Sequence, residues 1–437
     1  MAEILSHIKL NMDESLLKRL CDYQETLWLN PDYGTSLASA SDVSSDVSQE
    51  TVFRANRLLE RFAPYLETVF PETQVSNGII ESPIQEMQNI KEYLSIPGHV
   101  LIKRDDLMPV SGSIKSRGGI YEVLVFAEKL AAKNGFNPNT DDYRDLAQER
   151  FKKIFGQWKI EVASTGNLGL SVGLMASTLG FQARVHMSHD ATEWKINKLR
   201  QNGVQVVIYN DNFSNAVTMA RAASKKDDHS YFVDDEASKI LFAGYATAGE
   251  RVKQQIADLG IEVSKEKPLV VYLPAGVGGS PSGVAFGLKI QFGDSVMPIF
   301  VEPTHMPSVL LGMASGLNHD ISVYDIGIDG KTAADGLAVG RPSLIAGKYM
   351  QNKLFGIATV SDEHMFAFQG MLKKLENIEA EPSAVVGIQG LLASQKIKAI
   401  PSEATHMIWS TGGSMVPRET MNQYEKNALK YFAHWRV

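Results

Sequence analysis

The stretch Leu269-Val-Val-Tyr-Leu-Pro-Ala-Gly-Val-Gly-Gly-Ser-Pro-Ser-Gly283 is the most informative part of this chain for its fold. Its apolar start predicts a strand that is buried on both faces, and the glycines and serines that follow predict a tight turn. Such a turn offers backbone amides to a phosphate, although a purely structural turn is the alternative. Pro281 stands where G-x-G-x-x-G needs its third glycine, and no Gly-Lys-Ser/Thr follows, so the dinucleotide and P-loop motifs are both missing.

The same strand, turn and helix rhythm extends outward from this stretch in both directions. Expected strands are Val100–Lys103, Ile160–Ala163, Ala183–Met187, Val204–Tyr209, Tyr231–Val233, Leu269–Leu273 and Pro298–Val301. Helical patterns follow some of them, as in Tyr121–Leu130 and from Leu168 onward. The sequence therefore predicts an α/β fold with parallel-rich sheets covered by helices, which bind ligands beyond the carboxyl ends of the strands.

A chain of 437 residues is long enough for two lobes. We expect a larger lobe formed by residues 1–115 and 245–437 and a smaller one formed by 116–244. Residues 1–95 read mainly as helices that form an N-terminal extension, with a polar surface loop at 36–48. Residues 134–158 read as a polar insertion.

Composition narrows the classes of partner. With 50 acidic and 43 basic side chains the net charge is −7, and the absence of a long Lys/Arg run argues against nucleic acid. No apolar run approaches the ~20 residues that span a bilayer, and the charged start lacks the apolar core of a secretory signal. The single cysteine, Cys21, suits a reducing compartment, so we expect a cytoplasmic protein without a membrane partner.

Lys115 is the first candidate for chemistry. It lies in Asp106-Leu-Met-Pro-Val-Ser-Gly-Ser-Ile-Lys-Ser-Arg-Gly-Gly119, between an expected strand and an expected helix. The positive end of the helix dipole and partial burial both disfavour a protonated amine, which suits a lysine that forms a Schiff base. A solvated surface lysine is the alternative, but the small residues on both sides leave room for a flat ring.

Two further strand ends carry small polar residues. Val162-Ala-Ser-Thr-Gly-Asn-Leu-Gly169 offers amides and hydroxyls to a carboxylate, and Met407-Ile-Trp-Ser-Thr-Gly-Gly413 places the Thr411 hydroxyl at a strand end. The alternatives are a simple helix cap and a plain strand end. Asp235 follows the strand Tyr231–Val233, where a solvated turn and a substrate contact are both open. The ten histidines include no H-E-x-x-H, so we expect no metal.

Taken together, these motifs resemble the fold type II pyridoxal-phosphate family, which includes tryptophan synthase β chains and serine/threonine dehydratases. The match is most specific at Ser113-Ile-Lys-Ser-Arg-Gly-Gly119. Other stretches resemble the branch of this family that acts on D-serine, over nearly the full length of the chain. They are Glu25-Thr-Leu-Trp-Leu-Asn-Pro31, Arg61-Phe-Ala-Pro-Tyr-Leu66, Gly78-Ile-Ile-Glu-Ser82, Pro109–Lys115, Thr332–Arg341, Met415–Pro417 and Met421–Tyr424.

The resemblance implies pyridoxal 5'-phosphate held between two lobes, and it implies a role for each candidate. Lys115 would hold the cofactor as a Schiff base, Asn167 would contact the ring hydroxyl and Thr411 the ring nitrogen. Gly276, Val277, Gly278, Gly279 and Ser280 would hold the phosphate, while Ser164, Thr165 and Gly166 would bind the substrate carboxylate, with Asp235 near the substrate. The chain departs from the family pattern at Ser280 and Ser282, which stand where the family usually has glycine.

The implied activity is β-elimination of D-serine to pyruvate and ammonia, by a monomer that needs no protein partner and binds only a small amino acid. The same chemistry on L-serine or L-threonine is one alternative, and a protein that binds the cofactor without turnover is another. A nucleotide-dependent oxidoreductase is opposed by the missing G-x-G-x-x-G. The sequence leaves open which group removes the Cα proton, because a D-substrate turns that proton to the face opposite the one in an L-substrate.

Overall fold

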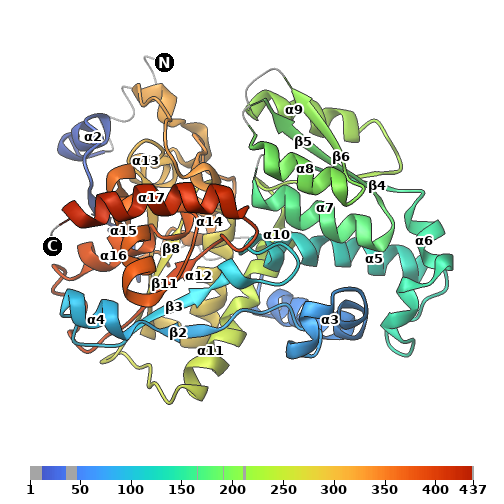
Figure 1. The fold of residues 1–437 in the computed structure, drawn as a ribbon, viewed down its shortest axis with the longest axis horizontal. Helices are drawn as coiled ribbons and strands as arrows, with labels where there is room; N and C mark the ends of the chain where they lie inside the picture. Colours follow the sequence, from blue (N-terminus) through green and yellow to red (C-terminus); the bar gives the residue numbers. More distant parts are fainter. Residues whose placement is uncertain (1–11, 36–46, 165, 190, 210–212, 436–437) are drawn as a thin grey trace. The chain divides into compact units, whose positions relative to one another are not determined.

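A computed structural model describes the chain except for residues 1–11, 36–46, 165, 190, 210–212 and 436–437 (Figure 1). The expected surface loop at 36–48 and the candidate Thr165 therefore lie largely or wholly outside the described residues. The chain forms two compact units. Unit 1 consists of residues 1–46, 82–107 and 248–437, and unit 2 consists of residues 47–81 and 108–247.

This division differs from the expected lobes at three places. Residues 47–81, 108–115 and 245–247 belong to unit 2, although we expected all three in the larger lobe. The physical reason is packing: α3 (Gln49–Val69) contacts α5 (Tyr121–Lys133) and α10 (Lys239–Ala246), which are helices of unit 2. Arg61 of α3 also binds Glu128 of α5 at 2.7 Å. Local sequence patterns carry no information about such a distant partner.

Unit 1 is built on a seven-stranded sheet in the order β1-β10-β9-β8-β11-β3-β2. The strands are β1 (Leu27–Leu29), β2 (Ile84–Glu86), β3 (Val100–Arg104), β8 (Leu269–Pro274), β9 (Val296–Pro303), β10 (Gly356–Val360) and β11 (Thr405–Ser410). The two edge strands β1 and β2 pair antiparallel with their neighbours, and the five inner strands are parallel. Every residue of β8 and β9 is buried, as expected for parallel strands covered on both faces.

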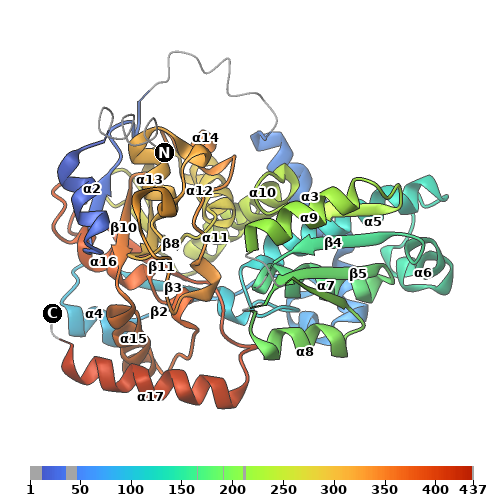
Figure 2. The ribbon, with the colours of Figure 1, turned by 90° about the horizontal axis from the view of Figure 1, so that it is seen from above.

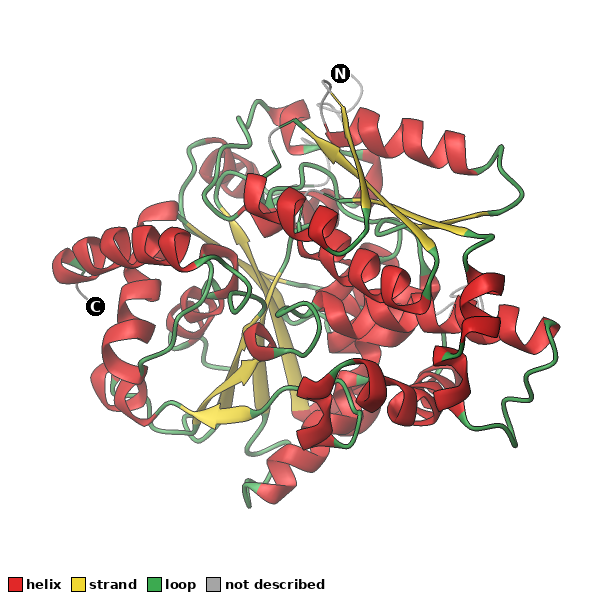
Figure 3. Cartoon of the chain, turned by 45° about the vertical axis from the view of Figure 1, so that its right-hand side comes forward, coloured by secondary structure: helices red, strands yellow, loops and turns green. Residues whose placement is uncertain are grey.

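Nine helices of unit 1 surround this sheet in the described part of the chain (Figure 3). They are α2 (Glu14–Cys21), α4 (Gln88–Leu94), α11 (Ala248–Asp258), α12 (Gly279–Phe292), α13 (Ser308–Ser315), α14 (Ala346–Met350), α15 (Asp362–Met371), α16 (Gly387–Ser394) and α17 (Arg418–His434). Helix α16 packs across β8 to β11, while α17 lies along α15 (Figure 2). A hydrophobic core cluster of this unit includes Tyr272, Val301 and Ile408.

Unit 2 contains a four-stranded parallel sheet in the order β6-β5-β4-β7. Its strands are β4 (Lys159–Ala163), β5 (Gln182–Ser188), β6 (Gln205–Tyr209) and β7 (Ser230–Val233). Besides α3, α5 and α10, its helices are α6 (Glu149–Phe155), α7 (Asn167–Leu179), α8 (Glu193–Gln201) and α9 (Phe213–Ser224). The α/β fold with parallel-rich sheets is thus confirmed, and each expected strand is present within one or two residues of its expected bounds.

Candidate active site

In unit 2 the segment that carries Lys115 is a tight, partly strained turn, here called the lysine turn (residues 109–120). Within it, Ser116 donates a hydrogen bond from its hydroxyl to the Pro109 carbonyl at 2.9 Å and lies 2.7 Å from the Ser111 hydroxyl. Val110 has φ +74°, which is unusual for a β-branched residue. Residues Ser116–Ile120 then form a π-helical turn (η3) that leads directly into α5. Strained residues and π-turns both concentrate at functional sites.

Neighbouring helices fix the backbone of the lysine turn. Ser171 of α7 donates a hydrogen bond from its hydroxyl to the carbonyl of Lys115 at 2.8 Å. A Cβ atom on Gly119 would lie 2.7 Å from the same hydroxyl, and one on Gly118 would lie 2.5 Å from the ring of Tyr245. The two glycines therefore serve close packing against α7 and α10, a use that the sequence analysis did not anticipate.

The Lys115 amine faces a carboxylate and an aromatic ring. Its Nζ lies 3.3 Å from Oδ2 of Asp235 and 5.6 Å from the ring centroid of Tyr245. The side chains of Lys115 and Asp235 are 16% and 25% exposed, so both are reachable by a small molecule. The candidate Asp235 therefore lies beside the candidate Lys115. Tyr245 and Ser171, which also contact the lysine turn, had no recognisable signal in the sequence.

The candidate carboxylate-binding residues lie at the carboxyl edge of the unit 2 sheet. Ser164 follows β4, and Asp235 follows the neighbouring parallel strand β7. The backbone N–H of Gly166 donates to the Ser164 hydroxyl at 3.1 Å, and Asn167 begins α7. The start of α7 therefore presents small residues and a helix N-terminus, which suit an anion.

In unit 1 the segment Ala275–Ser280, here called the glycine loop, joins β8 to α12. Its Gly278 has φ +92° and caps α12. A Cβ atom would lie 2.9 Å from Leu337 Cα if added to Gly276 and 2.8 Å from Ala346 Cβ if added to Gly278. The loop is therefore packed so closely that these two positions accept only glycine without a shift of their surroundings.

The glycine loop has the properties of a phosphate site. Its carbonyls are already bound, because Gly276 accepts from the Ser308 hydroxyl at 3.2 Å and Val277 accepts from the Ser343 amide at 2.7 Å. The amides at the start of α12 are the groups that a helix leaves without intrahelical partners. In the first turn of this helix, the fully buried Ser282 hydroxyl has no hydrogen-bond partner within the described structure. These features fit an anion such as a phosphate.

Thr411 lies at the same sheet edge as the glycine loop. It follows β11, which is parallel to and hydrogen-bonded with β8, and it is 8% exposed. A pocket of about 440 Å³ is lined by the next residues of this turn, Gly413 and Ser414, together with Arg104 and Asp106. Asp106 is held there by Arg104, whose Nη2 lies 2.8 Å from its carboxylate.

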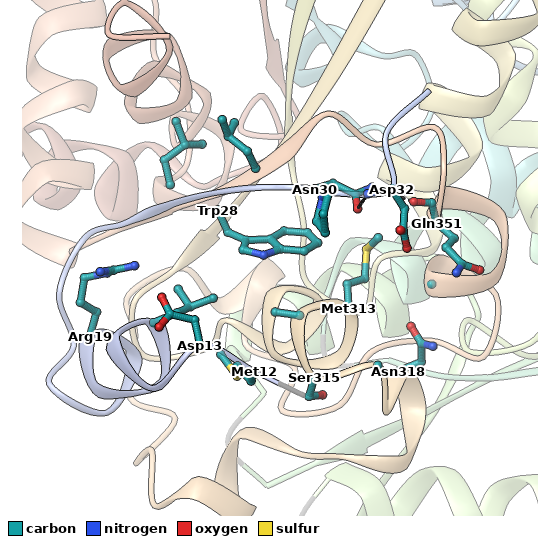
Figure 4. A pocket seen from close by; sticks show the side chains of 17 residues that line it. Met12, Asp13, Arg19, Trp28, Asn30, Asp32, Met313, Ser315, Asn318 and Gln351 are labelled. Carbon is teal, nitrogen blue, oxygen red and sulfur yellow. Dashed lines mark hydrogen bonds between the residues drawn. The ribbon is translucent and has the colours of Figure 1, made fainter. Parts of the chain in front are cut away.

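A larger pocket of about 510 Å³ in unit 1 has a different lining (Figure 4). The Trp28 side chain extends between Arg19 on one side and Met313 on the other (Figure 4). None of the predicted site residues lines it. In the described ranges, no group of three or more His, Cys, Asp or Glu side chains is arranged to hold a metal ion. None of the described helices is both long and apolar enough to cross a membrane.

Comparison with known proteins agrees with this geometry. The family described as "Pyridoxal-phosphate dependent enzyme" matches residues 75–412, which include every candidate residue named above. The chain belongs to this family. Its cofactor is accordingly pyridoxal phosphate, as the sequence resemblance implied.

The chain is also similar to individual relatives and solved structures. The chain is 71% identical over 436 residues to a probable D-serine dehydratase of Oenococcus oeni, with both chains fully covered. It is 51% identical over 417 residues to a probable D-serine dehydratase of Pediococcus pentosaceus, covering 93% of this chain and 95% of the relative. Diaminopropionate ammonia lyase from Escherichia coli shares the fold with a TM-score of 0.72 and 19% identity, covering 93% of this chain and 97% of that enzyme. These findings confirm the predicted fold type II architecture.

Proposed function

We propose that this enzyme is a D-serine ammonia-lyase. It eliminates water from D-serine, and hydrolysis of the released enamine by water then yields pyruvate and ammonia. The observation that carries the proposal is the Lys115 amine placed 3.3 Å from the Asp235 carboxylate, since elimination needs groups that can take and return a proton. The probable D-serine dehydratase relatives over the full length support D-serine as the substrate. The structure of the Escherichia coli diaminopropionate ammonia lyase in complex with D-serine, which matches with a TM-score of 0.68 and 18% identity, supplies the fold comparison.

The bound cofactor would supply a conjugated ring that stabilises negative charge developing on Cα of the substrate. Lys115 would hold the cofactor covalently and regain a free amine when the substrate amine replaces it. That amine and the Asp235 carboxylate are then two neighbouring groups that can exchange a proton. One of them removes the Cα proton, and the pair returns a proton to the departing hydroxyl, so that water leaves.

The remaining candidate residues would bind and orient the substrate and the cofactor. In unit 2, Ser164 and Gly166 at the start of α7 would receive the substrate carboxylate, and Asn167 would donate to the ring hydroxyl. In unit 1, the amides of Gly276–Ser280 would bind the phosphate, and the Thr411 hydroxyl would face the ring nitrogen. A hydroxyl, unlike a carboxylate, does not hold that nitrogen protonated, which favours prompt elimination over side reactions. Thr165 completes the proposed carboxylate site but lies outside the described residues.

A direct assay tests this function. Pyruvate formation is measured with D-serine, L-serine and L-threonine at equal concentrations, using enzyme saturated with pyridoxal phosphate. We expect D-serine to be the preferred substrate by kcat/KM. Preference for either L-amino acid would overturn the stereochemical assignment, and binding of the cofactor without turnover of any of the three would overturn the proposed activity.

We further propose that the enzyme is a cytoplasmic monomer. The single cysteine and the absence of a long apolar run in the sequence support the location in the cytoplasm. Sedimentation equilibrium of the purified enzyme tests the oligomeric state, with a mass near 48.1 kDa expected. A mass twice as large would contradict the proposal.

A further inference from the structure

Tyr245 touches the lysine turn at two places. It lies in α10, and its side chain is fully buried. Its ring packs against Gly118 so closely that a Cβ there would lie 2.5 Å from the ring carbon Cζ. The Lys115 amine lies over the same ring, 5.6 Å from the centroid. One side chain therefore supports both the backbone after Lys115 and the nitrogen at its tip.

The hydroxyl of Tyr245 does not explain why the side chain is there. It is buried without a hydrogen-bond partner in the described part of the chain. An unpaired buried hydroxyl destabilises a fold, and a phenylalanine would fill nearly the same space without that penalty. The favourable contacts of Tyr245 with the lysine turn come from the ring.

In the described part of the chain, Asp235 and the Tyr245 ring face the Lys115 nitrogen, and other charged groups near the lysine turn bind elsewhere. Arg117, in the turn itself, binds Glu81 at 3.0 Å. Glu122 of α5 is buried and accepts hydrogen bonds from Ser238 at 2.5 Å and from Tyr231 at 2.8 Å. Helix α7 contributes no charged side chain, and Lys239 is at the opposite end of α10 from Tyr245.

An aromatic face attracts a cation, and the attraction grows when water is excluded. The Tyr245 ring beneath the Lys115 nitrogen therefore attracts that nitrogen when it carries a positive charge. The ring also blocks movement of the π-turn toward α10, because Gly118 is already in contact with it. Both effects act on the group that bonds to the cofactor.

We propose that Tyr245 is a positioning residue for Lys115. Its ring packs against the turn that follows the lysine and stabilises positive charge on the lysine nitrogen. The same stabilisation applies when that nitrogen is bonded to pyridoxal phosphate. This inference rests on the proposed role of Lys115. The hydroxyl of Tyr245 has no part in it, so the ring and the hydroxyl can be tested separately.

The test uses the holoenzyme and follows the visible absorption band of the bound cofactor against pH. Protonation of the lysine nitrogen changes this band, so its pH midpoint reports the charge that the ring is proposed to stabilise. Tyr245→Leu should lower the midpoint by up to about one pH unit, the shift that corresponds to a cation–π contact in a desolvated site. Tyr245→Phe should leave the midpoint unchanged and should not lower the melting temperature.

A matched control separates this effect from loss of aromatic packing. Phe155 of α6 is fully buried in the same unit and stacks on Phe181 with a centroid distance of 4.8 Å. Phe155→Leu should lower the melting temperature and leave the midpoint where it is. If Tyr245→Leu does not retain the cofactor, Gly118→Ala takes its place, since the new Cβ must displace the Tyr245 ring; it should also lower the midpoint.

Two results would overturn the proposal. The first is an unchanged pH midpoint in Tyr245→Leu, or in Gly118→Ala if Tyr245→Leu loses the cofactor. The second is an equal shift of the midpoint in Tyr245→Phe and Tyr245→Leu, which would assign the effect to the hydroxyl. A different result would contradict the proposed role of Lys115 itself. A Lys115→Ala variant that keeps the titrating band would show that another lysine bonds the cofactor.

Discussion

The lysine turn in unit 2 and the glycine loop in unit 1 differ in the groups that they offer to a ligand. The lysine turn presents side chains, an amine paired with a carboxylate at 3.3 Å over an aromatic ring. The glycine loop presents backbone, and its glycines are packed against Leu337 and Ala346. Side-chain groups can change protonation during a reaction, whereas backbone amides only bind. The comparison therefore assigns chemistry to the lysine turn and cofactor affinity to the glycine loop.

The largest effect is expected from Lys115→Ala. Loss of the amine removes both the covalent attachment of the cofactor and one member of the proton-handling pair, so turnover of D-serine should fall by more than about 10⁴-fold. The melting temperature measured without cofactor should change little, because Lys115 lies in a turn outside the hydrophobic core. Pyruvate assays and thermal unfolding measure the two quantities. Substantial residual turnover would show that chemistry does not depend on the lysine turn.

Asp235→Asn should have the next largest effect. The amide keeps the shape of the side chain but cannot take up a proton, so kcat should fall by about 10²- to 10³-fold. The affinity for pyridoxal phosphate should stay within a few fold of the parental value, because the phosphate is proposed to bind elsewhere. Turnover is measured at saturating cofactor, and affinity is measured by equilibrium dialysis. A variant with normal kcat and weakened cofactor binding would show that Asp235 contributes to cofactor affinity and not to the chemistry.

A pair of glycine variants tests the proposed role of the glycine loop in cofactor affinity. Gly278 and Gly260 both have left-handed backbones, with φ +92° and +68°, and Gly260 has no atom near its added Cβ. At either position the left-handed backbone should make alanine cost roughly 1–2 kcal/mol of stability. Gly278→Ala should cost more than this, because its Cβ would lie 2.8 Å from Ala346 Cβ. Only Gly278→Ala should also weaken cofactor binding, by about tenfold, because it disturbs the proposed phosphate site. Equal cofactor affinity in the two variants would return the glycine loop to a purely structural role.

Much of this arrangement could be predicted from local sequence. Strands followed by small polar residues predicted β4, β8 and β11. The motif around Lys115 indicated this lysine as the candidate for the Schiff base. Tyr245 and Ser171 could not be predicted, because each reaches the lysine turn only through the packing of a distant helix. The strand β10 (Gly356–Val360) was also missed, since its short apolar run lies in a segment without a clear turn signal before it.

The smallest effect on turnover is expected from a buried histidine of unit 1. His406 in β11 is 2% exposed, and its Nδ1 lies 2.7 Å from the Tyr272 hydroxyl. Burial lowers the pKa of His406 from 6.5 to about 4. The unfolded chain therefore binds a proton at this residue between pH 6.5 and 4 while the folded chain does not, so stability should decline as pH falls through this window, by up to about 3 kcal/mol.

Urea unfolding at a series of pH values measures this decline. His406→Gln should show a flatter dependence between pH 6.5 and 4. It should leave turnover at neutral pH nearly unchanged, because His406 pairs with Val270 near the start of β8, whereas the glycine loop follows the end of that strand. Identical slopes in the variant and the parent would contradict the assignment of the acid sensitivity to His406.

The most direct test of the whole account is chemical labelling of the lysine. Treatment of the holoenzyme with borohydride reduces the bond between cofactor and lysine to a stable secondary amine, and peptide mass mapping then locates the pyridoxyl group. The account predicts that the label is on Lys115, in the peptide that contains Ser113-Ile-Lys-Ser-Arg117. A label on any other lysine, such as the fully buried Lys103 or Lys195, would contradict it.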